Sequence, residues 1–70
     1  MIRYLIVIEN AGSNYSAYSP DLPGCATTGA TIEETKASME GAIEFHLEGL
    51  REEGLPIPQP SSIADYVEVL

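Results

Sequence analysis

One long amphipathic helix is the feature that most limits the folds open to this chain. Thr31 and Glu34 fit a capping box, in which the threonine oxygen accepts a helix amide and the glutamate reaches back, and Gly54 is a natural helix stop. Spacing the residues between them by about 100° gathers one apolar stripe: Ile32, Met39, Ile43, His46, Leu47 and Leu50. We therefore expect a single helix that packs on a sheet.

Residues 2–9 are expected to form the first strand of that sheet, because they are rich in β-branched and aromatic side chains. Their apolar groups alternate between both faces, which is typical of a central strand. The turn residues at positions 10–14 and the period-two pattern at 15–19 predict a hairpin. After a Pro-Gly loop at residues 20–24, a short third strand is expected at 25–28.

The chain after the helix reads as a proline-rich connector followed by a strand. Residues 55–60 carry three prolines and predict an extended crossing that cannot pair fully with a sheet. Residues 65–70 have strand composition, and a strand, helix, strand connection implies a right-handed parallel crossover. The expected fold is α+β, one domain over residues 1–70, in the order β-β-β-α-β.

A chain of 70 residues has a thin core, and small domains usually need disulfides, metal or oligomerisation. Cys25 and His46 are the only residues of their types in the sequence, so self-association is the expected support. Phe45 lies off the apolar stripe, beside Gly41 and Gly49, on an outward or lateral surface. It is our candidate self-association contact.

The charge disfavours nucleic acid as a direct partner. Three basic residues against eleven acidic ones give a formal net charge of −8, which repels phosphate backbones. Acidic surfaces also steer basic partners, although solubility alone is an equal explanation. Glutamates four apart at positions 40, 44, 48 and 52 line one ridge, which faces solvent, holds a cation or faces a basic partner.

The usual machinery of an enzyme or a metal site is missing from the sequence. It has no second histidine, no Cys-x-x-Cys pair and no lysine in a glycine-rich phosphate loop. For His46 a packed position at the core edge outweighs a catalytic base, and for Cys25 a small buried group outweighs a nucleophile. We expect no catalysis, cofactor or metal. Without a signal peptide or an apolar run long enough to cross a bilayer, a cytosolic protein is expected.

Several motifs, in order, resemble the amino-terminal domain of HicB-type antitoxins. They are YSAYSPDLPGC at residues 15–25, TGATIEE at 28–34, AI at 42–43, HLEGL at 46–50 and GLPIP at 54–58. The resemblance implies a partial ribonuclease-H-like fold with a fourth strand beside the first. It also implies a small basic HicA-like toxin as partner, which has a double-stranded-RNA-binding fold and cleaves messenger RNA.

Two departures from the family limit what the resemblance implies. Family antitoxins commonly continue into a DNA-binding domain, whereas this sequence ends at Leu70, so DNA binding is not expected. Ribonuclease-H enzymes need acidic metal ligands on the sheet, whereas the first strand offers only Arg3 and Glu9. Toxin neutralisation is the first hypothesis. A homo-oligomeric scaffold or regulator without a toxin is the second, and a weak nuclease is a distant third.

The toxin contact is expected to combine the acidic ridge with a pre-ordered loop. The ridge supplies electrostatic approach through Glu40, Glu44 and Glu48. The loop, in which two prolines reduce the entropy lost on binding, supplies an apolar docking point through Asp21, Leu22 and Pro23.

The first testable expectation is that the purified chain does not bind duplex DNA at about 150 mM salt, near physiological ionic strength. The reason is the net charge of −8, which leaves no counterion release to drive association. Fluorescence anisotropy of a labelled duplex measures this directly. Submicromolar binding at that salt concentration would contradict it.

Overall fold

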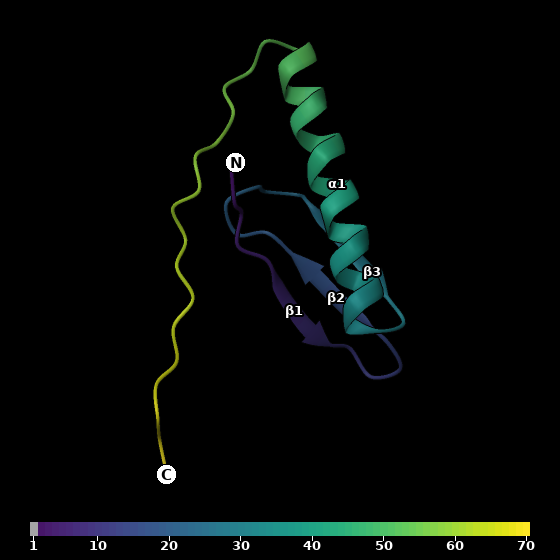
Figure 1. Cartoon of the computed structure of the whole chain (residues 1–70), viewed down its shortest axis with the longest axis vertical. Coiled ribbons are helices and arrows are strands. Elements are labelled where there is room, and N and C mark those ends of the chain that lie inside the picture. Colours follow the sequence, from purple (N-terminus) through teal and green to yellow (C-terminus); the bar gives the residue numbers. More distant parts are fainter. Residues whose placement is uncertain (1) are drawn as a thin grey trace.

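Three short antiparallel strands form the sheet. The computed structural model describes residues 2–70. In it β1 (Val7–Asn10), β2 (Tyr15–Tyr18) and β3 (Ala26–Gly29) lie in the order β1-β2-β3 (Figure 1). In the hairpin Val7 pairs with Tyr18 and Asn10 with Tyr15. The expected hairpin and third strand are confirmed, although β1 starts at Val7 rather than at residue 2.

The helix α1 (Ile32–Glu52) crosses one face of this sheet (Figure 1). Thr31 is the N-cap, and its Oγ1 accepts from the backbone N–H of Glu34 at 3.0 Å. The Glu34 carboxylate accepts from the N–H of Ala30 at 3.3 Å, one residue before the cap. The capping box is therefore confirmed, with its return bond displaced by one residue. Within residues 2–70 no helix has the length and apolar character needed to cross a membrane.

The helix ends where Gly54 was expected to stop it. Gly54 has φ 70°, a left-handed conformation that glycine adopts at little energetic cost because it has no side chain. Its N–H donates to the carbonyl of Arg51, and the N–H of Leu55 donates to that of Leu50 at 2.9 Å. These two bonds make a Schellman motif, which satisfies carbonyl groups at the end of the helix and turns the chain away from it.

The core lies between α1 and the sheet. Met39 and Leu47 are buried from the helix, and Ala17, Leu22 and Cys25 are buried from the sheet side. Ile43 and Leu50 pack against this cluster while partly exposed. Of the predicted stripe only Ile32 departs clearly, because at the first helical residue it is 49% exposed.

Thr35 is fully buried, although its residue type did not mark it as a core position. Its hydroxyl donates to the carbonyl of Thr31 at 2.7 Å, which satisfies the buried oxygen within the helix. A Cβ built on Gly29 would lie 2.8 Å from the backbone N and 2.9 Å from the Cα of Thr35. The helix therefore approaches β3 so closely here that only glycine fits at position 29.

The expected fourth strand is not seen in the described part of the chain. Residues 55–70 are extended without strand pairing, and residues from Ile63 onward are exposed. Two contacts hold this stretch: the Tyr4 hydroxyl donates to the carbonyl of Pro58, and Asp21 accepts from Ser61 and Ser62. Because residues 55–70 do not pair with β1, this strand lies at an edge of the sheet rather than at its centre.

We expect Gly29→Ala to destabilise the fold by about 1–3 kcal/mol, the usual range for overpacking. The atoms that the new Cβ would meet include the Thr35 backbone, which cannot rotate away. Gly41→Ala is the matched control, because a Cβ there meets nothing within 4 Å. It should stabilise the helix by about 0.5–1 kcal/mol. Urea unfolding at fixed protein concentration measures both, and equal effects of the two variants would disprove the close approach.

Candidate functional site

The outward face of α1 carries a row of exposed acidic side chains. Glu40, Glu44, Glu48 and Glu52 are all exposed, as the four-residue spacing predicts. We call these four residues the acidic ridge. The ridge stands clear of the core residues Met39 and Leu47, so its charges are available to a partner.

Phe45 is the one large apolar side chain of the helix that points almost fully outward, with 80% of its surface exposed. It lies between Glu44 and Glu48 of the acidic ridge on one side and Ala42 and Gly49 on the other, according to helical spacing. A ring this exposed loses most of the benefit of burial, so the position suits a contact with another molecule. Its outward placement agrees with the interpretation of the sequence.

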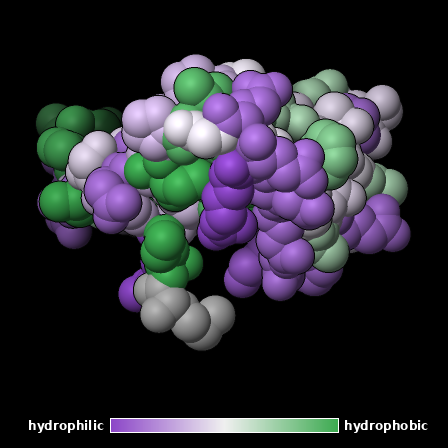
Figure 2. All heavy atoms as spheres, turned by 90° about the horizontal axis from the view of Figure 1, so that it is seen from above, coloured by the Kyte–Doolittle hydropathy of each residue, from purple (hydrophilic) through white to green (hydrophobic). Residues whose placement is uncertain are grey.

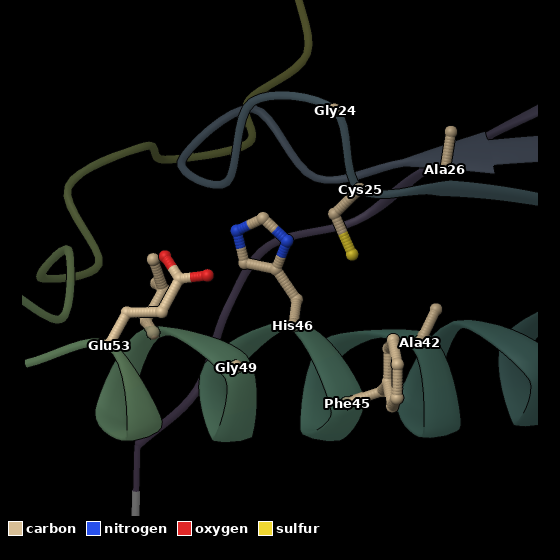
Figure 3. A pocket seen from close by; sticks show the side chains of 9 residues that line it. Gly24, Cys25, Ala26, Ala42, Phe45, His46, Gly49 and Glu53 are labelled. Atoms are coloured by element: carbon tan, nitrogen blue, oxygen red, sulfur yellow. The ribbon is translucent and has the colours of Figure 1, made fainter. Parts of the chain in front are cut away.

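Beside Phe45 a shallow groove of about 460 Å³ separates the helix from the start of β3 (Figure 3). In that view the His46 ring and the Cys25 side chain enter the space between the two segments, while Phe45 projects from the helix near Ala42. The lining residues come from both sides: Gly24, Cys25 and Ala26 from the loop and strand, and Ala42, Phe45, His46, Gly49, Leu50 and Glu53 from the helix and its end.

The chemistry of the groove favours contact over catalysis. Cys25 is 5% exposed, and burial raises the pKa of its thiol, so the sulfur stays protonated near neutral pH. His46 is half-buried at the edge of the core, close to its expected position. Among residues 2–70 no group of three histidine, cysteine, aspartate or glutamate side chains is arranged to hold a metal ion.

Leu22, expected as an exposed docking residue, is fully buried in the core. The loop turns inward because the N–H of Leu22 donates to the carbonyl of Ser19, and the N–H of Cys25 donates to that of Leu22. A partner could contact Leu22 only if the core opened. Pro23 remains exposed beside the groove-lining Gly24.

Asp21 is committed to a contact within the chain. Its carboxylate accepts from the backbone N–H of Ser62 and of Ser61, each at 3.1 Å, and from both serine hydroxyls. The backbone N–H of Ser62, then that of Ser61 and the hydroxyl of Ser62, hold the pKa of the Asp21 carboxyl below its ordinary value. We call Asp21, Ser61 and Ser62 the Asp21 clamp, and it fixes where the C-terminal segment leaves the domain.

The sequence did not reveal which residues line the groove together with Phe45, or which residues donate hydrogen bonds to Asp21. The groove needs Ala26 and Glu53, which are distant in sequence and meet only after the helix docks. The clamp joins residues 40 and 41 positions apart. Two features of the sequence pointed to these contacts. Gly41 and Gly49 each lie one helical turn from Phe45, and two serines directly follow Pro60.

We expect the Asp21 clamp to open in acid. Because the folded-state pKa of Asp21 is depressed, its stabilisation is complete above the unfolded value of about 3.9 and is lost as pH falls through the lower folded value. The amide resonances of Ser61 and Ser62 should therefore titrate below about pH 3.9. Asp21→Asn should abolish this titration. Asp65→Asn is the control, since Asp65 accepts only from the N–H of Tyr66. A midpoint above the unfolded value would disprove the clamp.

With this geometry established, comparison with known proteins gives a consistent result. The family model for the HicB-like antitoxin of bacterial toxin-antitoxin systems matches residues 4–69. A UPF0150 protein of Synechocystis is 32% identical over 69 residues, which are 97% of this chain and 87% of that protein.

A second relative is longer than this chain. An uncharacterized 14.9 kDa protein from the rep-hol intergenic region of Haemophilus phage HP1 is 36% identical over 64 residues. The match covers 91% of this chain but 48% of the phage protein, so this chain spans about half the length of that relative.

Proposed function

The chain belongs to the HicB-like antitoxin family, and from this premise we propose that it binds and neutralises a small basic toxin that cleaves messenger RNA. The binding surface in this proposal is the outward face of α1. It consists of the acidic ridge, Phe45 and the groove beside it. Neutralisation is by occlusion: the antitoxin covers the toxin surface that RNA would otherwise reach, and no chemical step is needed.

The observation that carries the proposal is Phe45, an 80% exposed aromatic ring set among exposed glutamates. A protein that cleaves RNA must present cationic groups to phosphates. Carboxylates in the same arrangement compete for those groups, and an aromatic ring that enters an apolar pocket supplies the residence time. The combination therefore fits a basic protein partner better than solvent alone.

The groove gives the partner a second point of contact. Phe45 and Gly24 line its opposite sides, so a side chain of the toxin that enters it would touch both the helix and the loop that carries Pro23. This retains the expected cooperation between the acidic ridge and the loop. Leu22 is fully buried and does not contact the toxin in this proposal. Asp21 binds Ser61 and Ser62 in the Asp21 clamp and does not contact the toxin either.

The second candidate function is a homo-oligomeric scaffold or regulator without a toxin. The exposed Phe45 favours this candidate as well, because a second copy could cover the same ring. Charge distinguishes a second copy from a basic toxin as the partner of this face. A second copy brings another net charge of −8 to the acidic ridge, whereas a basic toxin neutralises it, so the helix face favours the toxin.

The test uses a purified basic HicA-like toxin, sought as a small basic reading frame adjacent to the gene for this chain. Glu44→Gln with Glu48→Gln should slow association by roughly tenfold and flatten its salt dependence, since exposed charges act on encounter. Phe45→Ala should mainly speed dissociation, at a cost of about 1–4 kcal/mol. Binding kinetics at low and high salt separate these effects.

Glu9→Gln is the control for charge, because it removes the same charge from an exposed position on β1 rather than on the helix. It should change association much less than Glu48→Gln alone. Unchanged rates for all the helix variants would place the toxin elsewhere. Loss of self-association by Phe45→Ala, with toxin binding intact, would favour the scaffold.

A further inference from the structure

The C-terminal segment, residues 61–70, leaves a run of large apolar side chains uncovered, a feature that often marks an interaction site. Its large apolar side chains are almost entirely uncovered: Ile63 at 89%, Tyr66 at 94%, Val67 and Val69 at 86% each, and Leu70. In the view of Figure 2 hydrophobic atoms gather toward the left, the side on which this segment runs in Figure 1. Such β-branched and aromatic residues favour a strand.

Within the described chain, the edge strand β1 lacks the neighbouring strand that such a segment could supply. Its order in the sheet leaves one side of β1 without a neighbouring strand in the part of the chain that the structure describes. In residues 4–8, which lead into β1, Tyr4, Ile6 and Ile8 pack against the core and alternate with Leu5 and Val7, and all five are half-buried. A strand that is apolar on both faces, with an open edge, is built to lie inside a larger sheet.

A groove of about 430 Å³ lies between this edge and the C-terminal segment. One wall consists of residues 5–8 and the other of residues 63–66. The two walls run in the same general direction in Figure 1. The Asp21 clamp and the bond from Tyr4 to Pro58 anchor the chain just before the second wall.

The volume of the groove corresponds to a short stretch of extended chain. The product of the strand spacing, the rise per residue and the sheet thickness is about 160 Å³ for each residue of a strand. The groove therefore admits roughly three residues of extended chain, comparable with the four residues of each wall.

We propose that the groove receives the C-terminal segment of a second copy of this chain, in a reciprocal exchange about a two-fold axis. Each segment then lies between the β1 edge of the other copy and that copy's own C-terminal segment. Because β1 and its own segment run in the same direction, the two-fold axis makes the incoming strand antiparallel to both walls. One sheet then continues through both copies.

A second copy fits the groove for three reasons. The occupant must be extended and largely apolar, and residues 63–70 are unpaired and expose five large apolar side chains beside Asp65 and Glu68. A two-fold interface covers both open edges and both exposed segments with one set of contacts. It also adds core to a chain of 70 residues that has little of its own.

Charge gives this interface a signature unlike that of a toxin contact. Both copies carry a net charge of −8, so added salt screens their repulsion and should strengthen self-association. Binding of a basic toxin to the acidic ridge should weaken under the same change. The two kinds of association are therefore distinguishable, and failure of one leaves the other testable.

Sedimentation equilibrium of the full chain tests the exchange. We expect a monomer–dimer equilibrium at micromolar concentration, at least as tight at 500 mM salt as at 50 mM. Val67→Pro should raise the dissociation constant roughly tenfold or more, because proline removes a backbone donor from the exchanged strand. Val67 is 86% exposed in the single chain, so this variant should leave the monomer fold unchanged by circular dichroism.

Two controls decide between this interface and its rivals. Phe45→Ala should leave the dimer intact, whereas a dimer lost with Phe45→Ala and kept with Val67→Pro would overturn the proposal in favour of the helix face. Hydrogen exchange should show protection of amides at residues 5–8 and 63–70 that rises with protein concentration. Protection independent of concentration means that each segment closes on its own β1. That result, or a monomer at every concentration, overturns the exchange.

Discussion

The structure depends on the packing of one helical stripe against one small sheet. Met39 and Leu47 reach the core from α1, and Ala17, Leu22 and Cys25 meet them from the other side. Because side chains in a helix are fixed relative to each other, burial of these two residues decides the direction of every other side chain on the helix. The outward position of Phe45 and of the acidic ridge is a consequence of that packing.

The same packing covers one face of the sheet and leaves the edge at β1 without a neighbouring strand among residues 2–70. The close approach of Gly29 to Thr35 brings the helix onto β3, while β1 at the far side ends the sheet. A chain this short cannot cover both sides at once. The two surfaces that we propose for partners, the outward helix face and the β1 edge, are among those that the core leaves uncovered.

Local signals predicted most of the elements, and long-range contacts account for the errors. The N-cap at Thr31, the stop at Gly54 and the hairpin each depend on a few neighbouring residues and were predicted correctly. The fourth strand depended on pairing between segments some sixty residues apart, which composition cannot guarantee, and it was not found. The candidate site was recovered in part: Phe45 and the glutamates are exposed as expected, whereas Leu22 is buried.

The sequence by itself determined the order of the three strands and the helix, the single stripe of the helix, the acidic character of its outer face and the family. Each of these follows from periodicity, capping chemistry, charge or an ordered set of motifs. Only the tertiary structure decided that Leu22 turns inward, that Asp21 holds Ser61 and Ser62, and that residues 63–70 stand apart from β1. These outcomes join residues far apart in the chain, and the balance between such contacts is settled by geometry that no local pattern contains.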